Sequence, residues 1–108
     1  MVVWLRKKTM KKMLYLFFSL LFVLSGCSQN EEKYINSGNA KTDLKDYNGA
    51  ITDFTKVIES DPKFVEAYFS RGIAKILLGQ KHSGCLDLSK AGDLGLVAAD
   101  EAIKKYCK

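Results

Sequence analysis

The chain repeats itself after 34 residues, and this period restricts its fold more than any other feature of the sequence. When the sequence is shifted by 34 residues, identical residues align at spaced positions along residues 31–64 and 65–98. They include Tyr34 with Tyr68, Gly38 with Gly72, Ala40 with Ala74, Lys41 with Lys75, Leu44 with Leu78, Asp53 with Asp87 and Lys56 with Lys90. A fixed period of this length indicates stacked supersecondary units, because each unit buries its apolar face only against a neighbour.

The small residues of the repeat predict closely packed helices. Gly38 and Gly72 interrupt helical patterns, where glycine costs about 1 kcal/mol relative to alanine. Their presence therefore indicates a packing reason. Ala50 and Gly84 are small at the positions where the second helix of each unit would press on the first.

Breaks in the pattern divide each unit into two helices. The segments 45–47 and 79–81 separate the first helix of a unit from the second, and Asp61-Pro62 separates the units because proline disfavours helical geometry in the preceding residue. The sequence thus predicts helices over residues 31–44, 48–60, 64–78 and 82–93.

A fifth helix is predicted over residues 97–107. Its apolar residues follow the spacing of a one-faced helix, at Ala99, Ala102, Ile103 and Tyr106. This helix would cap the array, and Gly92 and Gly95 are expected to form the turn before it.

These residues together resemble the tetratricopeptide (TPR) repeat family over residues 31–95, and residues 85–107 resemble the closing segment of small bacterial TPR proteins. The resemblance implies an all-α fold for a domain of residues 33–108. It consists of two helix-turn-helix repeats, about 31–64 and 65–98, and a capping helix, about 97–107, in an α-solenoid.

The TPR resemblance also implies a peptide-binding groove lined by the first helix of each unit. The residues matched to it are Asn36, Asn39, Thr42, Asp43, Phe69, Ile73, Ile76 and Leu77. Burial against neighbouring helices is the alternative for the apolar members. Ile35 and Ser70 stand where charged residues would clamp a C-terminal carboxylate in some TPR proteins, so such a ligand is disfavoured.

Residues 1–26 have the three parts of an export signal. A basic segment through Lys12 precedes an apolar core over residues 13–24, and small residues follow at Ser25 and Gly26. The core is too short for the roughly 20 residues of a membrane-spanning helix. Initiation at Met1 and initiation at Met10 are both compatible with this signal.

The junction Leu24-Ser25-Gly26-Cys27 resembles the lipobox of bacterial lipoproteins. The resemblance implies lipidation of Cys27, a tether over residues 27–32, and a protein held on the bilayer of the cell envelope by palmitate-type chains. Ser28 after the cysteine favours the outer membrane. An ordinary signal anchor or cleaved signal with a chance cysteine is the alternative.

The distribution of charge argues against a nucleic-acid partner. The formal net charge is +5, but the segment through Lys12 holds five basic residues and no acid precedes Cys27, so the remainder is formally neutral. The single histidine, His82, lacks a partner at metal-ligand spacing, so neither a metal nor another cofactor is expected. No arrangement of nucleophile and base indicates an enzyme, and His82 is expected to be solvated at a helix start.

Cys85 and Cys107 lie at equal distances from Leu96, in the turn between the last two helices. In an antiparallel hairpin they would lie at one level, and an exported protein would meet oxidising conditions in which disulfides persist. A disulfide is therefore predicted. The alternative is a small buried Cys85 and a frayed end at Cys107.

The sequence predicts a membrane-anchored scaffold or adaptor that binds an unknown protein or peptide partner. A structural lipoprotein of the envelope, with no groove in use, is the second interpretation.

Overall fold

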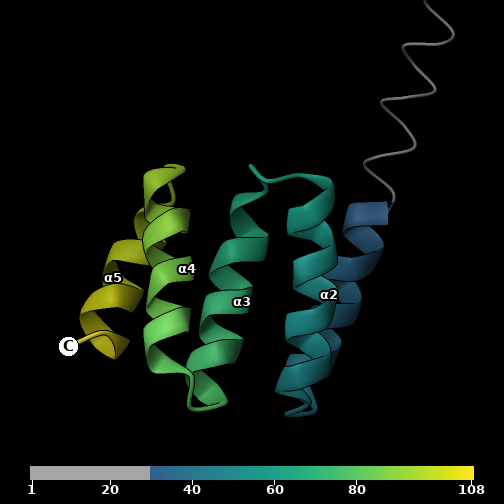
Figure 1. Cartoon of the computed structure of the whole chain (residues 1–108), viewed down its shortest axis with the longest axis horizontal. Coiled ribbons are helices and arrows are strands. Elements are labelled where there is room, and N and C mark those ends of the chain that lie inside the picture. The colour runs from purple at the N-terminus through teal and green to yellow at the C-terminus, as the bar shows by residue number, and fades with distance from the viewer. Residues whose placement is uncertain (1–29) are drawn as a thin grey trace, which may run out of the picture. The chain divides into compact units, whose positions relative to one another are not determined.

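The computed structural model describes residues 30–108, and all their regular structure is helical (Figure 1). The elements are a helix over residues 30–43, α2 (Tyr47–Ser60), α3 (Val65–Leu77), α4 (Lys81–Asp93) and α5 (Val97–Tyr106). Each predicted boundary agrees to within one residue. Residues 30–32, predicted as part of the tether, are already helical. The signal segment and Cys27 lie outside the described residues.

The helices stand side by side in chain order, and the 30–43 helix lies behind α2 in the view of Figure 1. Residues 31–108 form one compact unit. This is the all-α solenoid of two helical pairs and a capping helix that the repeat predicted. Within the described residues, no helix combines the length and apolar character needed to cross a bilayer.

Glycines allow the two helices of each pair to approach closely, as predicted. A Cβ built on Gly38 would lie 2.5 Å from the ring of Phe54, a residue with no exposed surface. In the second unit, a Cβ on Gly84 would lie 2.6 Å from the backbone oxygen of Gly72. Ala50 is fully buried. The small residues of the repeat therefore mark the helix contacts.

The core forms two clusters along the array. The first is buried around Ile35, Ala50, Phe54, Val57, Ala67 and Ala74, and the second around Tyr68, Ala91 and Ala99. Ile58 packs against both clusters. The second cluster includes a residue from each of α3, α4 and α5, so the capping helix completes the core at this end.

Residues with positive φ end three of the helices. They are Lys45 (φ 62°), Gly79 (φ 96°) and Gly95 (φ 102°). Gly95 forms the last turn as predicted, whereas Gly92 lies within α4 and contributes only its carbonyl oxygen, which accepts a hydrogen bond from the Gly95 amide. A single glycine with positive φ is enough to reverse the chain there.

Candidate functional site

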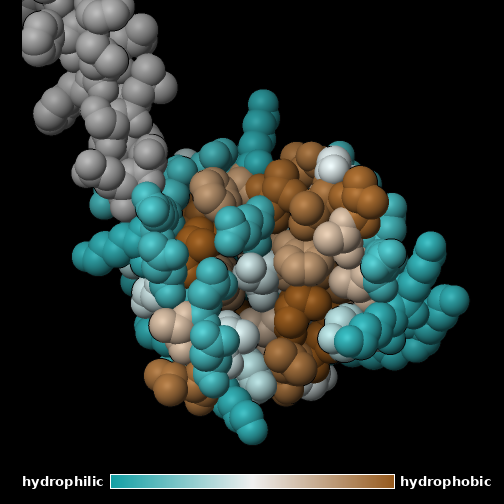
Figure 2. Space-filling view, turned by 180° about the vertical axis from the view of Figure 1, so that it is seen from behind, coloured by the Kyte–Doolittle hydropathy of each residue, from teal (hydrophilic) through white to brown (hydrophobic). Residues whose placement is uncertain are grey.

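The first helices of the units present the candidate protein-binding face. Figure 2 views the molecule from behind, the side on which the 30–43 helix lies, and shows a band of hydrophobic surface between hydrophilic margins. We define the first-helix face as the exposed or partly exposed side of the 30–43 helix, α3 and α5.

The polar residues predicted for the groove are accessible on the 30–43 helix. Asn36, Asn39 and Asp43 are exposed. Thr42 is half-buried, and its hydroxyl donates a hydrogen bond to the carbonyl oxygen of Gly38 (2.9 Å), so it binds its own helix. Three of the four polar positions thus have side chains open to a partner.

The apolar residues predicted for the groove are partly buried on α3. Phe69 packs against the cluster of Tyr68, Ala91 and Ala99, yet it keeps some exposed surface. A Cβ on Gly84 would lie 2.6 Å from the side chain of Ile76, so Ile76 packs on α4. Both interpretations of these residues therefore apply in part, and the groove itself stays a prediction.

Two apolar residues, of which Leu77 was predicted for the groove and Val97 was not, are more exposed than Phe69, Ile73 and Ile76. Leu77, the last residue of α3, is 49% exposed, and Val97, the first residue of α5, is 79% exposed. Leu77 lies one helical turn beyond Ile73, on the same side of α3. It extends the apolar part of the first-helix face to the end of the helix.

A buried carboxylate joins the two helices of the first unit. Asp53, on α2, is 4% exposed and accepts a hydrogen bond from the Ser37 hydroxyl (2.7 Å) and an ion pair from Lys41 (2.9 Å). Burial raises the pKa of Asp53, but the hydrogen bonds from Lys41 and Ser37 and the charges of Lys41 and Lys56 outweigh it, so the pKa is lowered. The hydrogen bond with Asp53 is the main cause that raises the pKa of Lys41.

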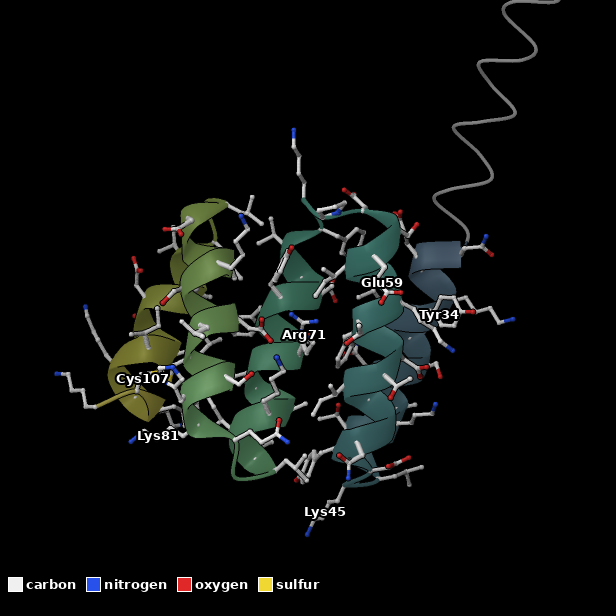
Figure 3. All side chains as sticks on the ribbon, in the orientation of Figure 1. Tyr34, Lys45, Glu59, Arg71, Lys81 and Cys107 are labelled. Carbon is white, nitrogen blue, oxygen red and sulfur yellow. A yellow bond between two sulfur atoms is a disulfide. The ribbon has the colours of Figure 1, made fainter. Side chains whose placement is uncertain are left out.

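The second unit repeats this arrangement with a different set of donors. Asp87, on α4, is 6% exposed and is held by the Arg71 guanidinium through two hydrogen bonds of 2.8 Å. Lys75 adds an ion pair of 2.9 Å. Arg71 also donates to the Thr55 hydroxyl (3.3 Å), which links α3 to α2. Figure 3 shows Arg71 pointing from α3 between the helices.

Sequence reasoning missed these two ion-pair networks. Their signal was present, since Lys41 matches Lys75 and Asp53 matches Asp87 across the repeat. Each carboxylate lies twelve residues after its lysine, a spacing that spans the turn between paired helices. Buried charges with complete partners fix the position of one helix against the other, so the networks hold the first-helix face in place.

A disulfide joins α4 to the residue that follows α5. The structure pairs Cys85 with Cys107, whose Cα atoms are 5.9 Å apart. Close by, the Lys81 ammonium donates a hydrogen bond to the backbone oxygen of Lys108 (2.8 Å). Figure 3 shows Cys107 and Lys81 at this end of the unit. These contacts hold the end of the chain against α4.

Within residues 30–108, no group of three His, Cys, Asp or Glu side chains is placed to hold a metal ion. His82 is the second residue of α4 and is exposed, as predicted for a solvated residue at a helix start.

Comparison with known proteins identifies the repeat. The family model described as TPR repeat matches residues 38–79, which run from Gly38 to Gly79 across three helices. The chain contains a TPR repeat. The match covers the 30–43 helix from Gly38 onward, all of α2 and all of α3.

A curated relative is similar to part of the chain. Protein STIP1 homolog of Dictyostelium discoideum is 32% identical over 71 residues, which are 66% of this chain and 13% of the relative. The chain thus matches only a small part of that protein's length. No solved structure matches.

Proposed function

We propose that this protein is a lipid-anchored TPR protein that serves as a protein-binding scaffold or adaptor in the bacterial cell envelope. The observation that supports protein binding is the first-helix face. Exposed Asn36 and Asn39 lie there on the 30–43 helix, and partly exposed Phe69 and Ile73 lie on α3. The TPR repeat and the relative that shares it support binding as the function class.

The proposed face offers the two kinds of contact that an extended peptide needs. The Asn39 amide can donate to and accept from a peptide backbone, and Phe69 and Ile73 offer apolar surface to alternate side chains. The ion pairs beneath them are formed within the array, so little reorganisation is needed on binding.

Support for the anchor comes from the sequence before residue 30. The basic segment, the short apolar core, the small residues and Cys27 occur in the order that export and lipidation require. Lipid chains on Cys27 would hold the domain on a bilayer, at about 0.8 kcal/mol for each buried CH₂ group. Ser28 favours the outer membrane.

Substitution Cys27→Ala tests the anchor. We expect the wild-type chain to incorporate radiolabelled palmitate and to fractionate with membranes, and the Cys27→Ala chain to incorporate none and to keep its uncleaved mass. Ser28→Ala is the matched control. Equal palmitate incorporation into the Cys27→Ala and wild-type chains would disprove lipidation at this residue.

Capture of partners from detergent-solubilised membranes tests the scaffold. We expect a partner identified by mass spectrometry to be lost on Asn39→Ala and on Leu77→Ser, because both side chains are exposed and neither change empties the core. Asn48→Ala, at an exposed position of α2, is the control. Capture that survives both changes would favour the second candidate, a structural lipoprotein whose face is unused, which the partial burial of Phe69 and Ile76 also supports.

A further inference from the structure

Acidic residues recur on the first-helix face with the period of the repeat. Glu32, Glu66 and Asp100 are spaced 34 residues apart, and each is exposed in the first turn of its helix. Successive units place equivalent residues at equivalent points of the stack. The three carboxylates therefore follow one another across the array.

Helical spacing places these acids beside the apolar surface. Glu66, Phe69, Ile73 and Leu77 follow the i, i+3, i+7, i+11 spacing of one side of α3. On the 30–43 helix, the same side carries Glu32, Asn36, Asn39 and Asp43, and on α5 it carries Asp100, Ile103 and Lys104. Among the residues named on this side of the three helices, four are acidic (Glu32, Asp43, Glu66 and Asp100) and one, Lys104, is basic.

The nearby basic side chains do not neutralise these acids. Lys41, Arg71 and Lys75 are engaged with Asp53 and Asp87. Within residues 30–108, the ion pairs of the structure involve those two aspartates, and none includes Glu32, Asp43, Glu66 or Asp100. The first-helix face therefore keeps its negative charge.

Helix stability accounts for only part of this pattern. An acid in the first turn interacts favourably with the positive end of the helix dipole, typically by about 0.3–1 kcal/mol, and this applies to Glu32, Glu66 and Asp100. Asp43 is the last residue of its helix, where the same dipole disfavours an acid. The shared property of the four acids is their side of the array.

We propose that the first-helix face binds a cationic peptide segment, one in which lysine or arginine side chains alternate with bulky apolar ones. This rests on the proposed scaffold function and names the chemistry of its partner. The apolar residues of the segment pack on Phe69, Ile73 and Leu77, while its basic residues pair with the acids on either side. Figure 2 shows a hydrophobic band between hydrophilic margins on this side of the molecule.

Binding of defined peptides to the full chain in nonionic detergent tests the proposal. The probe is a short fluorescent peptide in which Lys, Leu and Ser repeat, with both termini blocked, and its partner peptide has Glu in place of each Lys. Fluorescence anisotropy measures both, after subtraction of micelles without protein. We expect the Lys peptide to bind at least about tenfold more tightly than the Glu peptide. The affinity for the Lys peptide should fall as salt is added.

Neutralising the acids should weaken this binding without harming the fold. We expect the double variant Asp43→Asn, Glu66→Gln to bind the Lys peptide about fivefold more weakly and with a shallower salt dependence. Glu59→Gln, at an exposed position of α2 away from the first-helix face, is the matched control and should leave the affinity unchanged. Figure 3 shows Glu59 on α2.

Three results would overturn the proposal. They are equal affinity for the two peptides, an affinity that the double variant leaves unchanged, and self-association of the chain that Leu77→Ser abolishes, since a second copy would then occupy the face. If the double variant still captures a membrane partner that Leu77→Ser loses, the scaffold function stands and the cationic partner does not. If neither variant loses a partner, both fail.

Discussion

At the scale of single residues, two buried aspartates determine how each pair of helices fits together. Asp53 and Asp87 occupy equivalent positions, yet one is held by a hydroxyl and a lysine and the other by an arginine and a lysine. Within the described residues, no buried side-chain nitrogen or oxygen lacks a hydrogen-bond partner. Each carboxylate binds donors from the other helix of its pair.

The lowered pKa of Asp53 predicts a loss of stability in acid. The pKa of Asp53 in the folded chain lies below the unfolded value of about 3.9. At pH values between the two, the unfolded chain therefore binds more protons than the folded chain. The contribution of Asp53 is complete above the unfolded pKa and is lost as pH falls through the folded one. Urea denaturation at a series of pH values should show a steeper acid loss for the wild-type chain than for Asp53→Asn.

The control for this prediction is Asp43→Asn, which removes an exposed carboxylate. Its acid profile should follow that of the wild-type chain. Identical profiles for Asp53→Asn and the wild-type chain would contradict the assignment. The raised pKa of Lys41 has the opposite sign, so its contribution is present at neutral pH and is lost only as pH rises through its folded pKa.

At the scale of helices, glycine has two distinct roles along α4. A Cβ on Gly84 would meet the backbone oxygen of Gly72 and the side chain of Ile76, each at 2.6 Å. A Cβ on Gly92 would meet nothing nearer than 3.7 Å. The first glycine is required by packing, whereas the second only weakens its helix.

Gly84→Ala and Gly92→Ala should therefore change stability in opposite directions. We expect Gly84→Ala to destabilise the domain by about 1–3 kcal/mol, because backbone must move to admit the methyl group. Gly92→Ala should stabilise it by about 0.5–1 kcal/mol, through the higher helix propensity of alanine. Urea denaturation followed by circular dichroism measures both, and a destabilisation of similar size at the two sites would refute the packing role of Gly84.

The helices were predictable because their signals are local and repeated. Glycines at helix contacts, Pro62 between the units and the period itself fixed five helices to within one residue. The networks of Asp53 and Asp87 left a signal in the repeated lysine and aspartate. That signal alone did not show that the side chains meet, because their approach depends on the rotation of each helix about its axis. For the same reason the sequence could not show which predicted groove residues are open to a partner, and Ile76 packs on α4.

At the scale of the whole molecule, the described residues form a short array of helices with a small hydrophobic core. Two repeats and one capping helix form a small core, which favours an additional covalent restraint. Capping helix α5 buries only the small residues Ala99 and Ala102 completely or nearly so. The disulfide is the strongest link that holds this helix to the array.

Reduction or Cys107→Ser should loosen α5 before the rest of the domain. Removal of a bond that closes 22 residues is expected to cost about 3 kcal/mol. Hydrogen exchange should accelerate most in residues 97–106 and least in α2, and urea denaturation should report the loss. Reductant should not affect the Cys107→Ser variant further. Equal intact masses after alkylation, with and without reductant, would show that no disulfide had formed.

The close contact between Gly72 and Gly84 also bears on how the chain avoids errors during synthesis. A protein with two similar units can pair a helix with the wrong partner, within one chain or between two chains that exchange segments. If α2 took the place of α4 against α3, Ala50 would bring a Cβ to the point where one on Gly84 would lie 2.6 Å from the Gly72 oxygen. Because Gly84 has no Cβ, α4 can pack against α3 at this distance and α2 cannot. The difference between Ala50 and Gly84 thus favours the native pairing of helices over the exchanged one.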